Sequence, residues 1–408
     1  MSIAGLSLAG LSLAGLFLAI IVSCFTRLNI GVFSIVLAWI IGVYFGGMKL
    51  DTVIAGCPAS LFLTLAGVTL LFAQAQLNGT LDWVAHHAVQ VCRGNVGTIP
   101  IMFFVVGLGL ASIGPGNIAC IALIAPLAMA TARRAKVPPF LMAIMASNGA
   151  NAGALSPFAP TGVIATGLMT KIGLPGHEWQ TYGYNAAAHA LVAFAGYFLF
   201  GGAKLFRLTY EGPAQHEEPL NRSHLMTLAV IAALIASVML FKINVGMGAF
   251  VGAMILGNHT DAIRKMPWNV IVMVTGVTVL VGILDKTQGI QLFATLLARL
   301  STPHSATAVV AFVVGLISVY ASTSGVILPT FLPMVPSLVA SIGGGVSAFA
   351  LASSINVGGH LVDVSPLSTI GALCIASAID SKKLFNQMLA WGISMSVVGA
   401  AICWLFFR

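Results

Sequence analysis

The chain has 408 residues, of which 59% are hydrophobic and 7% are charged. A soluble domain has about a quarter of its residues charged, so this composition excludes a water-soluble globular protein and favours one that faces lipid. The net charge of +8 does not predict nucleic-acid binding, because the basic residues are spread through short segments and form no basic stripe.

The N-terminal apolar run continues to residue 25, which is too long for a signal peptide and predicts a first membrane-spanning helix. Two short amphipathic stretches, 80–92 and 288–300, are expected to lie along the membrane interface. The six cysteines are scattered without a CxxC pair, so they predict neither a disulfide framework nor a metal site. Since a span needs about 20 apolar residues, we expect spans, in chain order, at roughly 3–25, 30–48, 57–77, 181–206, 223–241, 243–258, 268–284 and 384–406.

Two longer apolar regions, 96–173 and 305–379, are each interrupted twice by glycine, proline and small polar residues. The interruptions are SIGPGN at 112–117, SNGANAGALSP at 147–157, STSG at 322–325 and NVGGHLVDVSP at 356–366. Non-helical backbone at membrane depth is tolerated only where it is buried in protein or lines a wet cavity. We therefore predict that these four breaks form the functional site, as two re-entrant hairpin tips and two broken helices.

The two halves of the sequence repeat each other. The pentapeptide FVVGL occurs at 104–108 and again at 312–316, and Ser156-Pro157 corresponds to Ser365-Pro366. The spacing between corresponding segments is nearly constant along the chain, which indicates a duplication. A re-entrant hairpin adds no membrane crossing, so each half is expected to cross an odd number of times. The second half must then lie upside down relative to the first.

We therefore predict an all-α polytopic membrane protein of two inverted repeats, each with three scaffold helices, a re-entrant hairpin, a broken helix and a final helix. The first repeat is expected at 1–203, with scaffold helices in 3–77 and transport elements in 96–203. A cytoplasmic linker at 204–222 leads to the second repeat at 223–408, with scaffold helices in 223–284 and transport elements in 305–406. If the base of the first hairpin is cytoplasmic, most of the 18 basic residues fall on the cytoplasmic side, as the positive-inside rule requires.

The hairpin tips are the predicted substrate site. A helix begins at each tip, and its free backbone N–H groups and positive dipole end favour an anion. Hydroxyl and amide side chains there would bind carboxylate oxygens without a fixed counter-charge; the alternative is that serine and glycine merely permit a tight turn. The candidate substrate-binding residues at the tips are Ser112, Gly114, Gly116, Asn117, Ser322, Thr323, Ser324 and Gly325.

The second breaks are predicted to bind a cation, because hydroxyl, amide and unwound backbone carbonyl oxygens suit a hard ion such as Na⁺. The alternative is a kinked helix whose polar groups are satisfied by its neighbours. The candidate Na⁺ ligands are Ser147, Asn148, Gly149, Asn151, Asn356, Gly358 and Asp363, with Ser156 and Ser365 beside them.

Asp363 is the one carboxylate that we place inside the membrane. A charged acid there is costly, so it is a functional candidate that could bind Na⁺, carry a proton or orient His360. A purely structural role in the unwound loop is the alternative. His189 and His360 are expected to be packed, hydrogen-bonded residues, and the pair at 86–87 is expected to be solvated.

The tips, each followed by proline, and the Ser-Pro broken helices resemble the ion transporter superfamily, which includes the divalent-anion:sodium symporters. The segment GGHLVDVSPLSTIGAL at 358–373 looks most like the MatC-type dicarboxylate (malonate) carriers. The resemblance implies a homodimer, an elevator motion and substrate contacts at Ser156, Pro157, Ser365 and Pro366. The symporters carry Ser-Asn-Thr at both tips, whereas this chain has Gly114-Pro115-Gly116 and Ser322-Thr323-Ser324.

We therefore expect a secondary active transporter, not an enzyme, that moves a small dicarboxylate such as malonate or a C4-dicarboxylate across the inner (plasma) membrane. The expected coupling ion is Na⁺ or H⁺, with no other cofactor. The alternatives are an ion antiporter or arsenite-type exporter of the same superfamily, or the membrane subunit of a binding-protein-dependent transporter. A membrane-embedded enzyme is disfavoured because the sequence has neither paired intramembrane acids nor an HExxH motif. The sequence also lacks a phosphate-binding loop, so we do not expect the chain itself to hydrolyse ATP.

Overall fold

The computed structural model describes residues 7–26, 28–81, 83–84, 94–210, 220–241, 243–319, 321–378 and 381–407. Within these ranges the chain is helical apart from loops and one pair of two-residue strands, β1 (Gly94–Asn95) and β2 (Thr209–Tyr210). Six of the described helices are long and apolar enough to cross a membrane: Ala59–Leu77, Gly116–Arg134, Trp268–Lys286, Thr323–Ile342, Ala348–Ala376 and Lys382–Phe406. The predicted all-α polytopic fold class is confirmed.

Large apolar side chains stand on the outer surface of these helices. Phe241 is 77% exposed and Leu199 is 76% exposed, and many other leucine, isoleucine and phenylalanine side chains are exposed with them. So much exposed apolar surface would be unfavourable in water, but it is the surface that a lipid bilayer covers.

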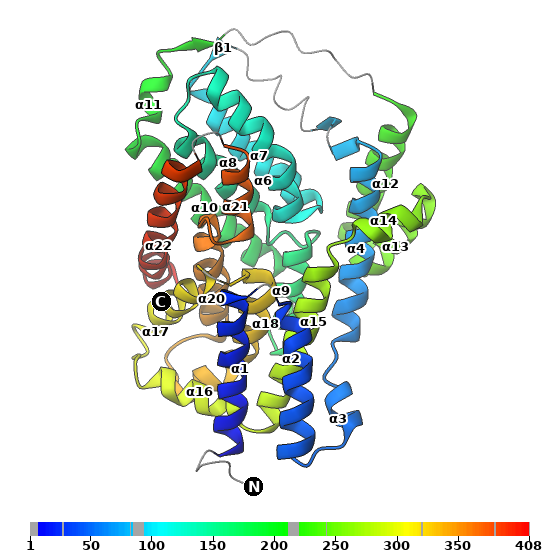
Figure 1. The fold of residues 1–408 in the computed structure, drawn as a ribbon, viewed down its shortest axis with the longest axis vertical. Helices are drawn as coiled ribbons and strands as arrows, with labels where there is room; N and C mark the ends of the chain where they lie inside the picture. Colours follow the sequence, from blue (N-terminus) through cyan, green and yellow to red (C-terminus); the bar gives the residue numbers. More distant parts are fainter. Residues whose placement is uncertain are drawn as a thin grey trace.

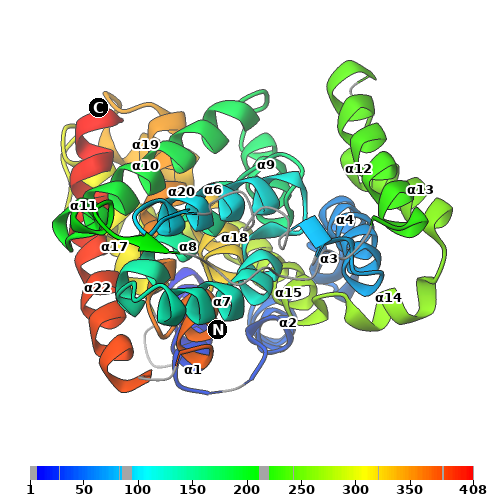
Figure 2. The same ribbon diagram turned by 90° about the horizontal axis from the view of Figure 1, so that it is seen from above.

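The scaffold helices follow the predicted spans closely. In the first half they are α1 (Leu8–Phe25), α2 (Ile30–Trp39) with its π-helical continuation η1 (Ile40–Phe45), the short α3 (Leu50–Ile54), and α4 (Ala59–Leu77). In the second half they are α12 (Arg222–Phe241), α13 (Val245–Leu256), the short α14 (His259–Lys265), and α15 (Trp268–Lys286). Seen from above, α3, α4 and α12–α14 gather at one side of the molecule, and α10, α17 and α22 at the other (Figure 2).

Paired glycines bring the scaffold helices of the two halves into backbone contact. A Cβ on Gly276 of α15 would lie 2.1 Å from the carbonyl oxygen of Gly31 of α2, and a Cβ on Gly67 of α4 would lie 2.2 Å from that of Gly246 of α13. Gly31 and Gly246 occupy corresponding positions of the two halves, as do Gly67 and Gly276. The same contact thus occurs twice with the halves exchanged, as expected for two copies of one unit related by a two-fold axis.

The part of the first half that was predicted to hold the transport elements begins with the hairpin of α6 (Thr98–Ile113) and α7 (Gly116–Arg134). It continues with α8 (Pro139–Gly153), α9 (Pro160–Lys171), α10 (Glu178–Leu199) and α11 (Gly202–Leu205). In the second half α16 (Gly289–Ala298) precedes a hairpin made of α17 (Ala306–Ser318), η2 (Thr323–Ile327), α18 (Leu328–Phe331), η3 (Leu332–Met334) and α19 (Val335–Ile342). The broken helix is α20 (Ala348–Leu361), η4 (Val362–Val364) and α21 (Thr369–Ala376), and the final helix is α22 (Ser381–Phe406).

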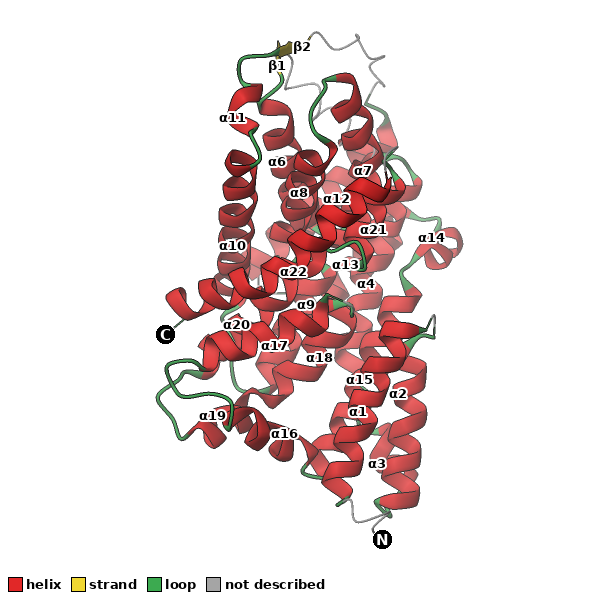
Figure 3. Cartoon of the chain, turned by 60° about the vertical axis from the view of Figure 1, so that its left-hand side comes forward, coloured by secondary structure: helices red, strands yellow, loops and turns green. Residues whose placement is uncertain are grey.

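The two hairpins come from opposite ends of the molecule. The hairpin of α6 and α7 lies toward the end that carries β1, whereas α17 and α18 lie toward the end that carries the N-terminus (Figures 1 and 3). This arrangement supports the predicted inverted relation of the halves. The repeat boundaries themselves stay a prediction.

The segment after the first repeat is fastened to the start of the first hairpin. Gly94 pairs with Tyr210 and Asn95 with Thr209 in the β1–β2 ribbon. The hydroxyl of Tyr197 lies 2.7 Å from the carbonyl oxygen of Gly97 and 2.9 Å from that of Gly202. The predicted linker at 204–222 therefore begins on the transport elements, and residues 211–219 lie outside the described part of the chain.

The predicted second breaks are shorter than the sequence suggested. Helix α8 continues to Gly153 and α20 continues to Leu361, so the breaks fall at 154–159 and 362–368. Gly149 and Gly358 are helical and pack against the hairpins: a Cβ on Gly149 would lie 2.3 Å from the carbonyl oxygen of Phe104, and one on Gly358 would lie 2.8 Å from Cα of Ala311. The expectation of unwound carbonyls at these two glycines was wrong, because they serve close helix packing instead.

The predicted interfacial stretch at 288–300 is the helix α16. Its counterpart at 80–92 lies mostly outside the described residues, and so do the histidines at 86–87. The predicted span at 181–206 is α10 followed by a turn and α11, because the chain enters the left-handed region at Gly201.

Candidate substrate and ion site

Glycine forms the first hairpin tip. Only Gly114 and Pro115 separate α6 from α7, and the φ angles of Gly114 and Gly116 are +139° and +77°, a region that other residues rarely adopt. A Cβ on Gly114 would lie 1.9 Å from two ring carbons of Phe72 on α4. The tip therefore turns sharply and rests directly on a scaffold helix.

Hydroxyl groups hold the second tip. Ser322 caps η2, where its Oγ accepts a hydrogen bond from the backbone N–H of Gly325 (3.2 Å). Thr323 donates through Oγ1 to the carbonyl oxygen of Gly359 on α20 (3.1 Å), and Ser318 Oγ donates to the same oxygen (3.0 Å). A Cβ on Gly325 would lie 2.0 Å from Sδ of Met273, so this tip also rests on a scaffold helix, α15.

A cavity of about 230 Å³ lies beside the first tip, and we call it the wide cavity. Its walls come from α4, the start of α9, the segment between α14 and α15, and both tips. The polar or tip residues among its lining are Thr69, Gln76, Gly114, Gly116, Asn117, Thr161, Lys265 and Ser324. This volume is below the about 300 Å³ at which drug-sized sites begin, so it suits a small solute.

A second cavity of about 140 Å³ lies between the tips and the second break, and we call it the narrow cavity. Its polar lining residues are Asn117, Ser322, Ser324, Asp363, Ser368 and Thr369. Asn117, Ile118 and Ser324 line both cavities, so the two adjoin. The structure thus brings both hairpin tips and the ends of both breaks to one place.

Four helical segments begin at these cavities. The first residues of α7 and α9 line the wide cavity, and those of α21 and of the continuous segment Thr323–Ile342 line the narrow one. A helix start presents N–H groups and about half a positive charge, so these four together make a favourable environment for an anion. Their electrostatic contributions add because they meet in a small enclosed volume.

Asp363 is the formally charged residue of the narrow cavity. It lies in η4 and is 7% exposed. Its backbone carbonyl accepts a hydrogen bond from Ser368, which in turn caps α21 by accepting from the N–H of Gly371 (3.3 Å). A carboxylate ringed by hydroxyl and amide oxygens is a donor set for a hard cation or a proton.

Six of the predicted site residues line the cavities. They are Gly114, Gly116, Asn117, Ser322, Ser324 and Asp363. The other candidates do not line these cavities: Ser147, for example, contacts Cys374 (3.2 Å), and Asn356 Nδ2 contacts the sulfur of Met169 (3.6 Å). Ser156 donates to the carbonyl oxygen of Ser112 (2.6 Å), and Ser365 Oγ accepts from the N–H of Leu367 (3.3 Å).

A buried amide network supports Asn117 from behind. Asn117 Nδ2 donates to Asn151 Oδ1 (2.9 Å) on α8, and Asn185 Nδ2 of α10 donates to the backbone oxygen of Asn151 (2.8 Å). Asn148 Oδ1 accepts from Nδ1 of His189 (2.8 Å), while Asn148 Nδ2 donates to the carbonyl oxygen of Ile144 (2.8 Å). The amide oxygens of Asn148 and Asn151 thus accept hydrogen bonds from protein donors, while Nδ2 of Asn151 has no partner among the described residues.

The two halves each contribute one buried histidine to the interior of the bundle. His189 on α10 and His360 on α20 are both fully buried, and these two helices pack against each other. The Nδ1 of His360 lies 2.7 Å from the carbonyl oxygen of Asn356, so Nδ1 carries the proton. The Nε2 atoms of both rings have no hydrogen-bond partner among the described residues.

Sequence reasoning missed the scaffold wall of the wide cavity. One face of α4 contributes Thr69, Phe72, Ala73 and Gln76 to this wall. The rest comes from Lys265 at the end of α14 and Pro267 just before α15. Only the 3- and 4-residue spacing on α4 could have indicated a common face, and it did not say what that face meets. Ser368 and Thr369 stand in the segment that suggested the MatC resemblance, but they were not assigned a role.

Within the described residues, no group of three or more His, Cys, Asp or Glu side chains comes together as a metal site would require. The available ion ligands are therefore hydroxyl and amide oxygens with one carboxylate. Such a set suits an alkali cation better than a transition metal.

Comparison with known proteins agrees with this architecture. Residues 6–154 match the family described as the dicarboxylate carrier protein MatC N-terminus. An uncharacterised transporter of Mycobacterium tuberculosis is 27% identical over 386 residues, covering 86% of this chain and 87% of its own length. A second one from the same organism is 25% identical over 379 residues, covering 86% of each chain.

The fold is also similar to a solved structure. The crystal structure of the YdaH transporter of Alcanivorax borkumensis superposes with a TM-score of 0.59 and 14% sequence identity, covering 90% of this chain and 88% of the other. The chain is therefore a multi-pass membrane protein with the fold of a known transporter, similar over most of its length to bacterial transporters and over residues 6–154 to the MatC dicarboxylate carriers.

Proposed function

We propose that this protein is a secondary active transporter that moves a small dicarboxylate across the inner membrane, driven by Na⁺ or H⁺. The observation that carries the proposal is the meeting of four helix starts at two adjoining cavities, one of which holds a buried carboxylate. The starts of α7 and α9 favour an anion in the wide cavity, and the Asp363 carboxylate with its neighbouring hydroxyl oxygens favours a cation in the narrow cavity. The MatC match and the relatives' description as transporters support the same function.

The two cavities would bind different ligands. A dicarboxylate in the wide cavity would receive N–H groups from the starts of α7 and α9, with Asn117 and Thr161 as side-chain donors. The coupling ion would occupy the narrow cavity beside Asp363, Ser322 and Ser324. Because Asn117 and Ser324 line both cavities, binding of the ion and binding of the anion would order the same residues.

A bound cation lowers the cost of carrying a dianion through an apolar bundle, since the pair carries less net charge than the dianion alone. The two tips rest on scaffold helices through Gly114 against Phe72 and Gly325 against Met273. We propose that loaded hairpins and broken helices slide against this scaffold as a unit, in an elevator motion, and that the scaffold helices form a homodimer. Malonate and C4-dicarboxylates are the proposed cargo.

The test is uptake by the purified full-length protein in liposomes. Labelled malonate and labelled succinate are offered with an inward Na⁺ gradient, with an inward proton gradient, and with neither. We expect accumulation of at least one dicarboxylate with one gradient, and none in protein-free liposomes. Failure of both substrates under both gradients would contradict the proposal.

Asp363 also favours an ion antiporter as a second candidate, because a carboxylate ringed by oxygens can exchange cations without an anionic cargo. The same liposomes, loaded with a pH-sensitive dye, separate the two functions. An antiporter exchanges Na⁺ for H⁺ with no dicarboxylate present, whereas the proposed symporter moves ions only when dicarboxylate is added.

A further inference from the structure

The short helix α14 carries a lysine into the wide cavity. Lys265, the last residue of α14, lines this cavity together with Gly114, Gly116 and Asn117 of the first tip. Among the lining residues of the wide cavity it is the one with a formal charge. An anion held at the start of α7 would therefore lie in a cavity whose lining includes one exposed cationic residue.

The position of α14 is fixed by contacts with α4 and α15. Gln74 of α4 donates to the backbone oxygens of Ala253 and Gly257, just before α14. Trp268 Nε1 donates to the carbonyl oxygen of Ile263 (2.7 Å) at the other end. Ala262 is fully buried between them. The Lys265 backbone is thus part of the rigid scaffold rather than of a free loop.

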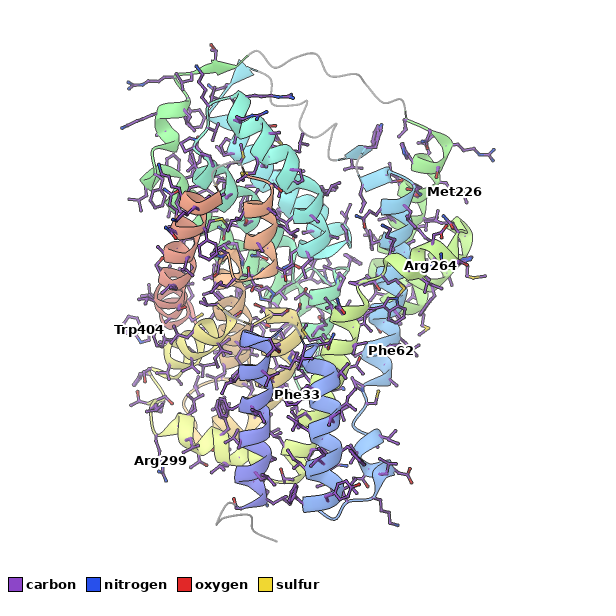
Figure 4. All side chains as sticks on the ribbon, in the orientation of Figure 1. Phe33, Phe62, Met226, Arg264, Arg299 and Trp404 are labelled. Carbon is purple, nitrogen blue, oxygen red and sulfur yellow. The ribbon has the colours of Figure 1, made fainter. Side chains whose placement is uncertain are left out.

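Lys265 has no acidic partner in the part of the chain that the structure describes. Its neighbour Arg264 lies 3.9 Å from Asp261, and both of those side chains are largely exposed (76% and 59%). Figure 4 labels Arg264 on the same short helix. The two adjacent cations therefore differ in their surroundings. Arg264 pairs with Asp261 outside the cavity, whereas Lys265 lines the cavity without an acidic partner among the described residues.

The charge is present in only one half of the protein. Pro267 before α15 corresponds to Pro58 before α4 in the repeat, so the position of Lys265 corresponds to Gly56. A lysine demanded by the scaffold fold would be expected in both halves. The predicted inversion, however, places Gly56 at the opposite membrane face, where the positive-inside rule disfavours lysine, so the role of Lys265 is argued from its place in the cavity lining.

We propose that Lys265 is a specificity-determining residue that contacts the second carboxylate of the substrate and so makes the wide cavity prefer dianions to monoanions. The proposal rests on the proposed dicarboxylate function and deepens it. The first carboxylate sits at the helix starts of α7 and α9, which a monoanion could also use. The second carboxylate extends toward the scaffold, where Lys265 supplies the balancing charge.

The experiment measures binding by the purified full-length protein, with malonate and succinate as dianions and acetate and butyrate as monoanions. Kd values are obtained by ligand-dependent thermal stabilisation at a pH at which both carboxyls are ionised. The variants are Lys265→Gln, Lys265→Ala and Lys265→Arg, with Arg264→Gln as the matched control. Because the Lys265 side chain is exposed and unpaired, and the Arg264–Asp261 pair is largely exposed, all four variants are expected to melt like the wild type without ligand.

We expect both neutral variants to weaken dianion binding about three- to fivefold, the upper part of the range of an exposed ion pair, and to leave monoanion binding unchanged. Lys265→Arg and Arg264→Gln should keep wild-type Kd values. Unchanged dianion binding in the neutral variants, or an equal loss in Arg264→Gln, would overturn the role of Lys265 and leave the transport function intact. A wild-type protein that binds none of the four acids would instead overturn the proposed function itself.

Discussion

Asn117 Nδ2 lies 2.9 Å from Asn151 Oδ1 and donates a hydrogen bond to it, which ties the first hairpin tip to the helix before the first break. Both side chains are buried, and Asn117 lines both cavities. The residue that would sense both anion and ion is therefore held by a residue that touches neither cavity.

This bond predicts strong coupling between two substitutions. Asn117→Ala removes a direct contact, and Asn151→Ala removes the group that orients it, so each should weaken substrate binding by up to about tenfold, as expected for one hydrogen bond of about 0.5–1.5 kcal/mol. The double variant should be no weaker than Asn117→Ala. A double-mutant cycle on Kd measures this, with the exposed Asn269→Ala as a control. Additive losses would contradict a positioning role for Asn151.

Asp363→Asn tests the coupling ion. The neutral side chain keeps the shape of the narrow cavity but removes its charge, so we expect uptake to lose its dependence on the Na⁺ or proton gradient and to fall to the rate without a gradient. Asp285→Asn, an exposed carboxylate at the end of α15, is the matched control and should keep the wild-type dependence. Unchanged sodium and pH dependence in Asp363→Asn would defeat the assignment.

The glycine contacts of the scaffold predict a large difference between two Gly→Ala variants. In Gly276→Ala the new methyl would lie 2.1 Å from the carbonyl oxygen of Gly31, so the helices must move apart, at a cost of about 1–3 kcal/mol. Gly183 of α10 has open space around it, and Gly183→Ala should be neutral or stabilising by about 0.5–1 kcal/mol. Thermal melting in detergent compares them. Equal melting temperatures would mean that the scaffold helices are not in backbone contact.

The unpartnered Nε2 atoms of His189 and His360 predict an ordered water. Both Nδ1 atoms donate to oxygens, so both Nε2 atoms are acceptors that need a donor, and a buried water satisfies such groups. An experimental density map should show a peak within hydrogen-bonding distance of the Nε2 atom of His360, equally strong in Na⁺ and in choline buffer. In His360→Leu the peak should disappear. A peak that appears only in Na⁺ would identify an ion site instead.

The sequence predicts the four interruptions well because each combines residues that regular helices avoid at membrane depth. Gly114-Pro115-Gly116 and the serines around Ser322 can only mark turns or caps, and both became hairpin tips. It predicts the extent of the second breaks poorly. Gly149 and Gly358 stand in runs of small residues that would equally well unwind a helix or let two helices approach closely, and only the packing of α6 and α17 decides between the two.

The scaffold wall of the wide cavity could not be predicted for a different reason. Phe72 and Gln76 belong to a helix whose composition is that of any membrane span, and nothing in the order of residues says that the first tip rests on it. Lys265 is likewise indistinguishable in sequence from the other loop cations that orient a membrane protein. Its place at the cavity follows from the tertiary contacts of α14 alone.

The β1–β2 ribbon limits how far the first hairpin and α12 can move apart. Because Thr209 and Tyr210 are fastened to the start of the first hairpin, the connection to α12 begins at the ribbon and not at the end of α10. Residues 211–219 between Tyr210 and Leu220 reach at most roughly 35 Å when fully extended, at about 3.5 Å per residue. If the protein moves by the proposed elevator motion, a displacement that carries Tyr210 and Leu220 farther apart than this reach would require the β1–β2 pairing to break.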